Sequence, residues 1–268
     1  MSVAMALRST PMLRKYRRFP RLMFWLRRFQ GVNYEPEMEL LDILCDPAAT
    51  SVDVGAKLGM YTDRLRRHSR DVVAFEPIPH LVELLRSTVG RKGCRIEACA
   101  LSDAPGTTRM RIPFGSNGEV KLGRSTIEPG NSLTHDDVAD VDEIEVELRT
   151  LDQHDLRGVG FIKIDVEGHE NAVLRGATET LTRERPNLLV ECNEHHAPNA
   201  LAELAELTTR LGYAGYFRGD AGLQAMSSIP DRTHFQVASI ENFLFVHSSR
   251  PEVVKRLETR LADAARGA

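Results

Sequence analysis

The chain has 268 residues, enough for one large α/β domain with an extension, and its 42% hydrophobic and 27% charged content is ordinary for a globular protein. Its formal net charge of −3 gives no general reason to expect nucleic acid, and no apolar run reaches the roughly 18 residues of a membrane span. The four cysteines form no C-x-x-C pair, which favours reduced thiols and a cytoplasmic location over a disulfide framework or a zinc site.

Residues 1–40 are expected to form a basic helical extension. The segment carries eight lysine and arginine residues before its first acid, Glu35, and aromatic and aliphatic residues are interleaved with them. One interpretation is an amphipathic segment that makes peripheral contact with an anionic membrane or grips a substrate. The other is a helical arm that packs its aromatic face on the main domain. The segment is also Arg-rich and acid-poor like a transit peptide, but it lacks a secretory apolar core.

The main domain is expected to span residues 41–268, with a short helix at 37–44 leading into it. Its first unit reads as strand, turn, helix and strand over residues 51–77. Gly55 and Gly59 bracket a tight turn in which the backbone approaches a ligand or the next helix. The second strand ends at Glu76-Pro77, where a carboxylate lies beside the turn and can accept hydrogen bonds from a ribose. The pattern predicts half of a nucleoside-cofactor site.

The turn distinguishes between two cofactors. Nicotinamide dinucleotides favour G-x-G-x-x-G, whereas residues 55–59 read GAKLG, without the middle glycine, and Asp53 precedes them. S-adenosylmethionine has no pyrophosphate, and its ammonium group can be held by an acid at the tip of a strand. The sequence therefore favours S-adenosylmethionine. An NAD-dependent dehydrogenase of Rossmann type and a non-catalytic cofactor-binding module stay as alternatives.

Further along the chain, residues 79–89 predict a helix and residues 95–101 a strand that ends in Ser102-Asp103. A β-rich insertion near 106–149 follows, with strands at 107–112 and 143–151. The intervening residues 115–137 are rich in Gly, Asn, Ser and Asp, and they are interpreted as a lid or substrate loop.

The C-terminal half continues the alternation of strands and helices. Strands are expected at 160–166, 188–192, 213–217 and 242–247. Helices are expected around Val173, Ala177 and Leu181, along a leucine stripe from 201 to 211, and at 251–265. This order predicts a doubly wound sheet, with cofactor and substrate at the carboxyl ends of its strands.

Five sequence blocks then occur in order: DVGAKLGMYT (53–62), FEPIP (75–79), ALSD (100–103), TLD (150–152) and FIKIDVEGHE (161–170). VLRGA (173–177) and NFLFV (242–246) follow. Over about residues 50–247 the chain resembles the FkbM-type S-adenosylmethionine-dependent methyltransferase family, which is largely associated with O-methylation of sugars and natural products. The resemblance implies a class I methyltransferase Rossmann-like doubly wound sheet, mostly parallel, with an antiparallel strand near the C-terminus.

Carried over to this chain, the resemblance and the turn chemistry give one set of expected cofactor-binding residues. They are Asp53, Gly55, Ala56, Lys57, Gly59, Tyr61, Thr62, Glu76, Pro77, Ser102, Asp103 and Asp165. One position departs from the family, which usually has Asn where this chain has Lys57. A lysine there either reaches the cofactor carboxylate or points to water.

Methyl transfer to an alcohol requires alignment of the reacting atoms and removal of a proton. The candidate catalytic residues are Asp165, Glu167 and His169, on one strand-to-helix turn. Each also has a structural interpretation, as an acceptor for backbone donors, a helix N-terminal charge or a solvated side chain. Asp165, Glu191 and Asn193 could instead hold Mg²⁺. A metal-free base is preferred, because no ligand spacing here is diagnostic.

The expected acceptor is a small molecule with a hydroxyl group, in a sugar or a glycosylated metabolite, because the candidate bases are carboxylates and histidines. Nucleic acid is not expected, since residues 115–137 have no aromatic stacking platform beyond the neighbouring Phe114. The oligomeric state is left open.

Overall fold

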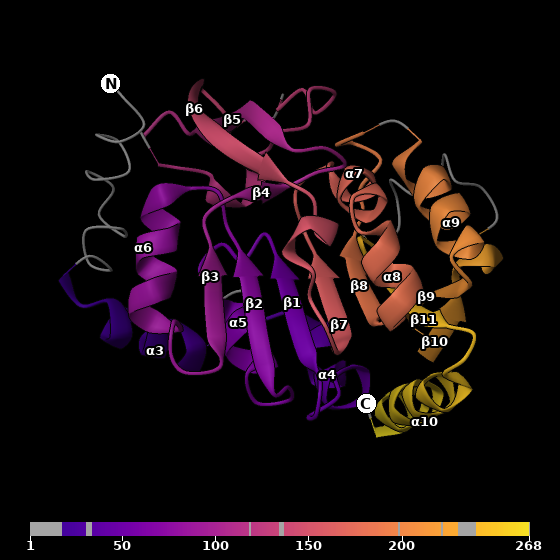
Figure 1. Cartoon of the computed structure of the whole chain (residues 1–268). Coiled ribbons are helices and arrows are strands. Elements are labelled where there is room, and N and C mark those ends of the chain that lie inside the picture. The colour runs from indigo at the N-terminus through magenta and orange to yellow at the C-terminus, as the bar shows by residue number, and fades with distance from the viewer. Residues whose placement is uncertain are drawn as a thin grey trace.

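The central sheet is built around β1 (Thr50–Val54), all five residues of which are buried. The computed structural model describes residues 18–30, 34–117, 119–133, 137–197, 199–220, 222–229 and 240–267. Eight strands form one sheet in the order β10-β9-β11-β8-β7-β1-β2-β3, with helices on both faces (Figure 1). The class I methyltransferase fold predicted from the sequence is confirmed.

Five strands of this sheet are parallel, and all of them except the edge strand at 94–97 are largely buried, as strands covered on both faces are. They are β1, β2 (Asp71–Phe75), β3 (Cys94–Glu97), β7 (Val159–Ile164) and β8 (Asn187–Glu191). The helices that follow or connect them are α5 (Met60–Leu65), α6 (Pro79–Thr88), α7 (Glu170–Arg175), α8 (Thr178–Glu184) and α9 (Ala200–Arg210). Because the chain returns after each strand, their carboxyl ends lie at one edge.

The C-terminal part of the sheet is antiparallel, as predicted. The strand β11 (Asn242–His247) inserts between β8 and β9 (Tyr213–Gly219) and runs antiparallel to both. A further strand, β10 (Gly222–Ala225), pairs antiparallel with β9 and was not predicted. Successive residues of β11 face opposite sides: Phe243 packs in the cluster beneath α7–α9, and Leu244 in the one beneath α10 (Pro251–Gly267).

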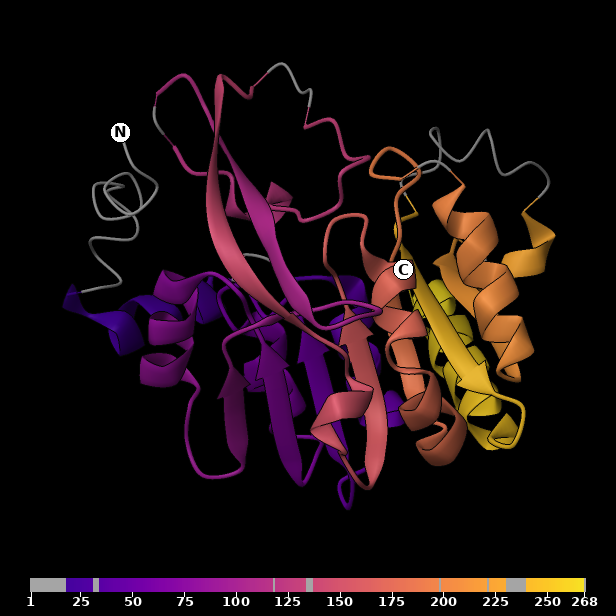
Figure 2. The same ribbon diagram turned by 45° about the horizontal axis from the view of Figure 1, so that its top comes forward.

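The predicted strand at 95–101 is wrong as a single strand. Its first part is β3, whereas β4 (Ala100–Leu101) leaves the central sheet and pairs with β6 (Asp140–Arg149). With β5 (Gly106–Phe114) these strands form a second sheet, in the order β4-β6-β5. Figure 2 shows the long β5–β6 pair rising over the carboxyl ends of the central strands. The short helix η2 (Leu122–Arg124) lies in the connection between β5 and β6.

Two predicted helices are interrupted. The one expected at 37–44 is a 3-10 turn, η1 (Pro36–Leu40), followed by α4 (Leu41–Leu44). The one through Val173 and Leu181 divides into α7 and α8 at Gly176, where a Cβ atom would lie 2.0 Å from the Ser102 carbonyl oxygen. The remaining short helices are η3 (Asp152–His154) and η4 (Met226–Ser228).

Part of the basic N-terminal segment forms α3 (Pro20–Phe29), which lies beside α6. Residues 1–17 and 31–33 lie outside the described residues, and the division of the chain near residue 40 stays a prediction. In the described part of the chain, none of the helices combines the length and apolar character needed to cross a bilayer. The cytoplasmic location also stays a prediction.

Candidate active site

The turn after β1 takes backbone conformations that favour glycine. Gly55 has a φ of +77° and Gly59 of +83°. A Cβ atom at Gly55 would lie 2.0 Å from the Asp165 carbonyl oxygen, so only glycine lets the turn approach the end of β7 this closely. The N–H groups of Gly55 and Ala56 both donate to the Phe75 carbonyl oxygen, at 3.1 and 3.0 Å, which fixes the turn against β2.

Glu76, directly after β2, is buried beside this turn. Its carboxylate accepts hydrogen bonds from the backbone N–H groups of Lys57 and Ile78, each at 2.9 Å. Burial raises the pKa of Glu76 to about 7, although these two donors act in the opposite direction. The carboxylate is therefore held in one orientation at the position predicted for a ribose-binding acid.

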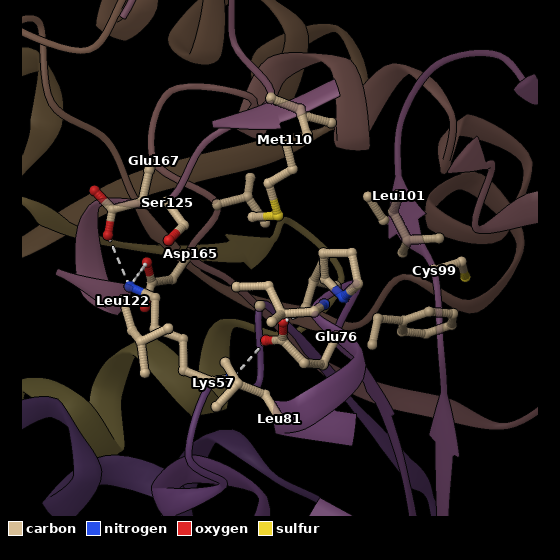
Figure 3. Close-up of a pocket in the computed structure, with 18 residues that line it drawn as sticks. Lys57, Glu76, Leu81, Cys99, Leu101, Met110, Leu122, Ser125, Asp165 and Glu167 are labelled. Carbon is tan, nitrogen blue, oxygen red and sulfur yellow. Dashed lines mark hydrogen bonds and ion pairs between the residues drawn. The ribbon is translucent and has the colours of Figure 1, made fainter. Parts of the chain in front are cut away.

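A cavity that is open to solvent lies next to Glu76 (Figure 3). Most of its wall is apolar. The end of β2, the loop after it and α6 supply Phe75, Pro77, Ile78 and Leu81, the segment through β4 supplies Cys99 and Leu101, and the insertion supplies Met110, Leu122 and Ile127, together with Ser125. The apolar part of this wall beside the fixed Glu76 carboxylate fits a nucleoside, whose base contacts apolar side chains while its ribose hydroxyls donate to the acid. These residues therefore fit the adenosine part of S-adenosylmethionine.

Two lysines hold the carboxylate of Asp165, the first residue after β7. Lys57 donates from Nζ to Oδ1 at 2.9 Å, and Lys163 donates from Nζ to Oδ2 at 2.8 Å. Burial alone would raise the pKa of Asp165, but the two ammonium groups outweigh it and hold that pKa below its ordinary value. Asp165 is thus a buried anion that anchors the cofactor turn through Lys57.

Glu167, two residues further on, has a φ of +60°. The insertion holds this conformation, because the Glu167 carbonyl oxygen accepts hydrogen bonds from Thr126 Oγ1 at 2.8 Å and Asn131 Nδ2 at 3.1 Å. Its side-chain Oε1 accepts from Lys57 Nζ at 2.7 Å, whereas Oε2 lies 3.6 Å from His196 Nε2. Burial raises the pKa of Glu167, opposed by Lys57.

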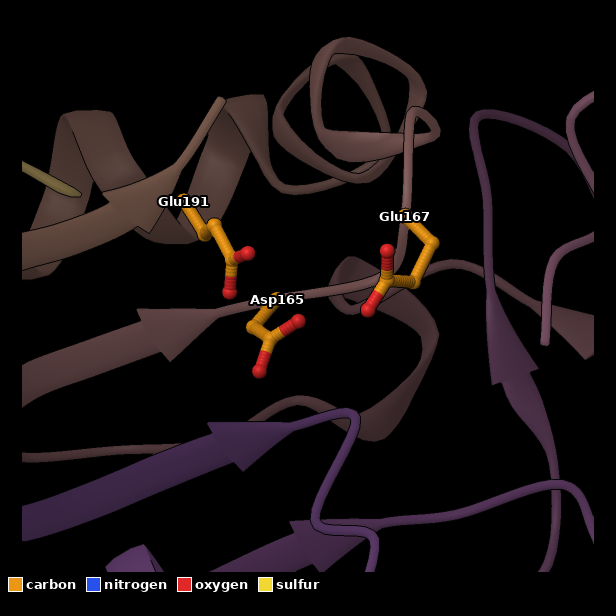
Figure 4. A group of neighbouring side chains, drawn as sticks. All are labelled: Asp165, Glu167 and Glu191. Carbon is orange, nitrogen blue, oxygen red and sulfur yellow. The ribbon is translucent and has the colours of Figure 1, made fainter. Parts of the chain in front are cut away.

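Asp165, Glu167 and Glu191 point their carboxyl groups toward one another (Figure 4), each offering an oxygen within 4.8 Å of the others. Burial, reinforced by the charge of Asp165, raises the pKa of Glu191 to about 10, so Glu191 keeps its proton at neutral pH. Carboxyl oxygens are the ligand type that Mg²⁺ prefers, but Lys57 and Lys163 already bind both oxygens of Asp165. The cluster is therefore arranged to bind the ammonium groups of these lysines and does not fit a divalent cation.

Asn193, the third predicted metal ligand, is engaged elsewhere. Its Nδ2 donates to Glu241 Oε1 at 2.7 Å, and its Oδ1 accepts from the His195 N–H at 2.9 Å. Neither contact brings it to the carboxyl cluster.

Three of the predicted site residues, Ser102, Asp103 and His169, lie behind the cavity. His169 bridges Ser102 and Glu128: its Nε2 lies 2.9 Å from Ser102 Oγ and its Nδ1 lies 3.0 Å from Glu128 Oε2. Asp103 pairs with Arg175, with 3.1 Å between its Oδ2 and the guanidinium. These contacts tie the end of β4 to the turn before α7 and to the insertion.

Three further predicted residues lie beneath the turn. Asp53 is fully buried and accepts a hydrogen bond from Thr62 Oγ1 at 2.6 Å. Its other oxygen, Oδ1, lies 4.0 Å from Lys163 Nζ. Tyr61 donates from its hydroxyl to Glu35 Oε2 at 2.7 Å, and its ring lies 5.0 Å from Lys163 Nζ. The ammonium group of Lys163 therefore lies close to both Asp53 and Asp165.

Sequence reasoning left out the cavity residues of the insertion, Met110, Leu122, Ser125 and Ile127. No local pattern marks them, because they reach the cavity only through the folding of the second sheet. Lys163 could have been found from the sequence, because it lies two residues before Asp165, on the same side of an extended segment, and it pairs with that acid.

Comparisons with known proteins agree with this geometry. The chain is 29% identical over 158 residues to the 2-O-methyltransferase NoeI of Sinorhizobium fredii (strain NBRC 101917 / NGR234), covering 55% of this chain and 65% of that protein. It is 27% identical over 192 residues to the 31-O-demethyl-FK506 methyltransferase FkbM of Streptomyces tacrolimicus, covering 62% and 73% of the two chains.

Among solved structures, the fold is similar to the methyltransferase FkbM from Methylobacillus flagellatus KT, with a TM-score of 0.51 at 15% identity, over 88% of this chain and 52% of that chain. The chain thus spans less than two thirds of the length of NoeI and about half of that structure. The model of the methyltransferase FkbM domain matches residues 53–217, more than half of the chain. The resemblance read from the sequence is confirmed: this chain belongs to the FkbM methyltransferase family.

Proposed function

We propose that this protein transfers a methyl group from S-adenosylmethionine to a hydroxyl group of a small acceptor, in a sugar or a natural product. The observation that carries the proposal is the carboxylate of Glu76, fixed between the Gly55–Gly59 turn and the apolar wall of the cavity. The printed names of the two relatives, a 2-O-methyltransferase and a 31-O-demethyl-FK506 methyltransferase, support an oxygen acceptor.

When bound, S-adenosylmethionine supplies an electrophilic methyl group. The chain's own part is to hold the cofactor and to exclude water around the reacting atoms. The Glu76 carboxylate accepts hydrogen bonds from the ribose hydroxyls, and the adenine packs on the apolar wall. Met110, Leu122 and Ile127 of the insertion complete that wall.

The acceptor hydroxyl must also lose a proton, and the geometry divides this task between two of the predicted catalytic residues. Both oxygens of Asp165 are bound by ammonium groups, which makes Asp165 a weak base. Glu167 lines the cavity, its Oε2 lies beyond hydrogen-bond distance from His196, and its pKa is raised. We therefore propose Glu167 as the proton acceptor and Asp165 as the group that positions Lys57. His169 supports the turn from behind.

Calorimetry with the product S-adenosylhomocysteine tests the cofactor half of this function. Glu76→Ala should weaken binding roughly 10- to 150-fold, the value of one hydrogen bond to a charged group. Glu83→Ala, which removes an exposed carboxylate from α6, should leave the affinity unchanged. Saturable binding of NADH without any response to S-adenosylhomocysteine would instead favour a dehydrogenase.

The acceptor is tested separately. The protein is incubated with a labelled methyl donor and a metabolite extract that contains sugars and glycosylated products, and products are identified by mass spectrometry. A labelled O-methyl ether that disappears with Glu167→Gln supports the proposal. Cofactor binding without turnover on any hydroxylated acceptor would favour a non-catalytic binding module, and a labelled nucleic acid would overturn the acceptor class.

A further inference from the structure

The helix α3 exposes large apolar side chains on one side. Of the six large hydrophobic residues that are exposed in the described part of the chain, four lie between positions 19 and 29: Phe19, Leu22, Trp25 and Phe29, with 54, 53, 55 and 79% of their surface accessible. The rings of Trp25 and Phe29 stack, with 5.6 Å between their centroids. Exposed apolar residues scattered singly are ordinary, but a cluster of this kind marks an interaction site.

The opposite side of α3 is fixed to the body of the protein. Phe24 is buried in a cluster with Leu81 and Leu85 of α6, and Arg21 donates from Nε to the Ser87 carbonyl oxygen at 3.3 Å. Arg28 adds an ion pair with Asp63, 3.5 Å away. One face of α3 thus packs on the main domain, as a helical arm would, and the other face is held outward.

Arginines border the apolar face. Arg18, Arg21 and Arg28 are all exposed, although Arg21 and Arg28 also contact Ser87 and Asp63 of the main domain, and no acidic residue occurs from position 18 to 30. Arginine next to exposed Trp, Phe and Leu is the composition of a helix that lies in the interface of an anionic membrane. A two-fold contact between copies of this chain would instead bring the same arginines against each other. At ten residues the helix is about 15 Å long, so it can lie on a bilayer without crossing it.

We propose that α3 docks this protein on an anionic phospholipid surface. Leu22, Trp25 and Phe29 enter the region between headgroups and acyl chains, and the arginines contact lipid phosphates. Phe24 packs on Leu81 of the cavity wall, but Leu22, Trp25 and Phe29 do not line the cavity, so the proposed docking does not depend on the identity of the acceptor.

Trp25 gives a direct measurement, because it is the single tryptophan of the chain. The full-length protein is titrated with vesicles of phosphatidylcholine alone and of phosphatidylcholine with phosphatidylglycerol, while tryptophan emission is recorded. The emission should shift to shorter wavelength only with the anionic vesicles, and added salt should reverse the shift. No shift at low salt, or an equal shift with both vesicle types, would overturn the proposal.

Two variants preserve the probe. Arg18→Gln combined with Arg28→Gln should lower partitioning into anionic vesicles roughly 30-fold, at about 1 kcal/mol for each arginine near the surface. Leu22→Ser combined with Phe29→Ser should remove the shift. The matched control is Arg95→Gln with Arg109→Gln, two exposed arginines on other elements, which should keep the binding. A blue-shifted emission that depends on protein concentration without vesicles would assign the face to a second copy and refute lipid docking.

Discussion

Lys57 Nζ lies 2.9 Å from Asp165 Oδ1, so one side chain joins the cofactor turn to the carboxyl end of β7. The same ammonium reaches Glu167 Oε1 at 2.7 Å. At the position where the family usually has Asn, this chain therefore carries the counter-ion of its own acidic cluster. The side chain of Lys57 is 29% exposed, whereas those of both acids are 7% exposed; Asp165 also has Lys163 as a partner, and Glu167 has Lys57 as its ion-pair partner at 2.7 Å.

Replacing Lys57 by Met should lower the free energy of unfolding at neutral pH by about 3 kcal/mol, because two buried carboxylates lose a shared partner. The deficit should shrink as the pH falls, since protonation of Glu167 relieves the repulsion. Urea unfolding of both proteins at pH 5 and pH 8 measures this difference. Lys92→Met, on an exposed loop, is the control, and an equal loss in the two variants would contradict the role of Lys57.

The same contacts predict how the enzyme responds to divalent cations. A chelator should leave wild-type turnover unchanged, because ammonium groups occupy both oxygens of Asp165. In Lys57→Met the carboxyl cluster loses one of these groups, and Mg²⁺ should raise the Tm of the variant but not that of the wild type. Wild-type activity that is lost in chelator and restored by Mg²⁺ would show that the cluster holds a metal.

Local sequence signals were sufficient for the cofactor turn. Gly55 and Glu76 are recognisable because a strand, a glycine and a strand-end acid follow one another within one structural unit. The break between β3 and β4 was missed, since it depends on pairing of Ala100 with Leu148, nearly fifty residues away. The break at Gly176 was missed for a similar reason, because it depends on the Ser102 carbonyl oxygen. Long-range pairing leaves no periodicity in the sequence.

The site shows the same division. Asp165 and Glu167 were found because they lie at the end of an apolar strand. That Lys57 binds both was not foreseen, because the turn and the end of β7 are more than a hundred residues apart. The apolar wall contributed by Met110 and Leu122 arises only when the insertion folds over the central sheet.

Gly55→Ala should damage both stability and cofactor binding. The residue has a φ of +77°, and a Cβ atom would lie 2.0 Å from the Asp165 carbonyl oxygen, so the turn and β7 must separate. We expect a loss of about 1–3 kcal/mol in the free energy of unfolding. Gly106→Ala, where the Cβ atom would meet nothing within 4 Å, is the matched control. A variant as stable as this control would disprove the close approach.

Binding of S-adenosylhomocysteine should depend on pH through Glu76, whose pKa burial raises from 4.5 to about 7. Ribose hydroxyls donate to the ionised carboxylate, so the affinity should fall about tenfold for each pH unit below 7. Calorimetry across this range measures it. Glu76→Gln should abolish the dependence. Glu170→Gln, which changes another buried acid with a pKa raised to about 7, should retain it, and a dependence that follows Glu170 would contradict the assignment.

The raised pKa of Glu76 also has a consequence for stability. Between about pH 4.5 and 7 the folded protein retains a proton that the unfolded chain releases, so this group's contribution to stability falls as the pH rises. Glu76→Gln lacks this titration, so its stability relative to the wild type should rise between pH 5 and pH 8, although its amide can accept only one of the two backbone hydrogen bonds. Thermal unfolding of both proteins at pH 5 and pH 8 measures this difference, and a relative stability that does not rise with pH would refute it.

Glu167→Gln and Asp165→Asn separate the proton acceptor from the residue that positions the site. Glu167→Gln should lower kcat by about 10²–10⁴-fold, the usual contribution of a general base. It should change S-adenosylhomocysteine affinity little, because the amide oxygen still accepts from Lys57. Asp165→Asn leaves Lys57 and the buried Lys163 without their shared anion, so it should lower the free energy of unfolding together with turnover.

Single-turnover kinetics and urea unfolding of the two variants test this division. If Asp165→Asn abolishes turnover without loss of stability while Glu167→Gln stays active, Asp165 is the base and the two roles are exchanged. A second check is the pH profile of kcat. Its acidic limb should move when Glu167 is replaced and should persist when His169, which contacts Ser102 and Glu128 behind the cavity, is replaced by Gln.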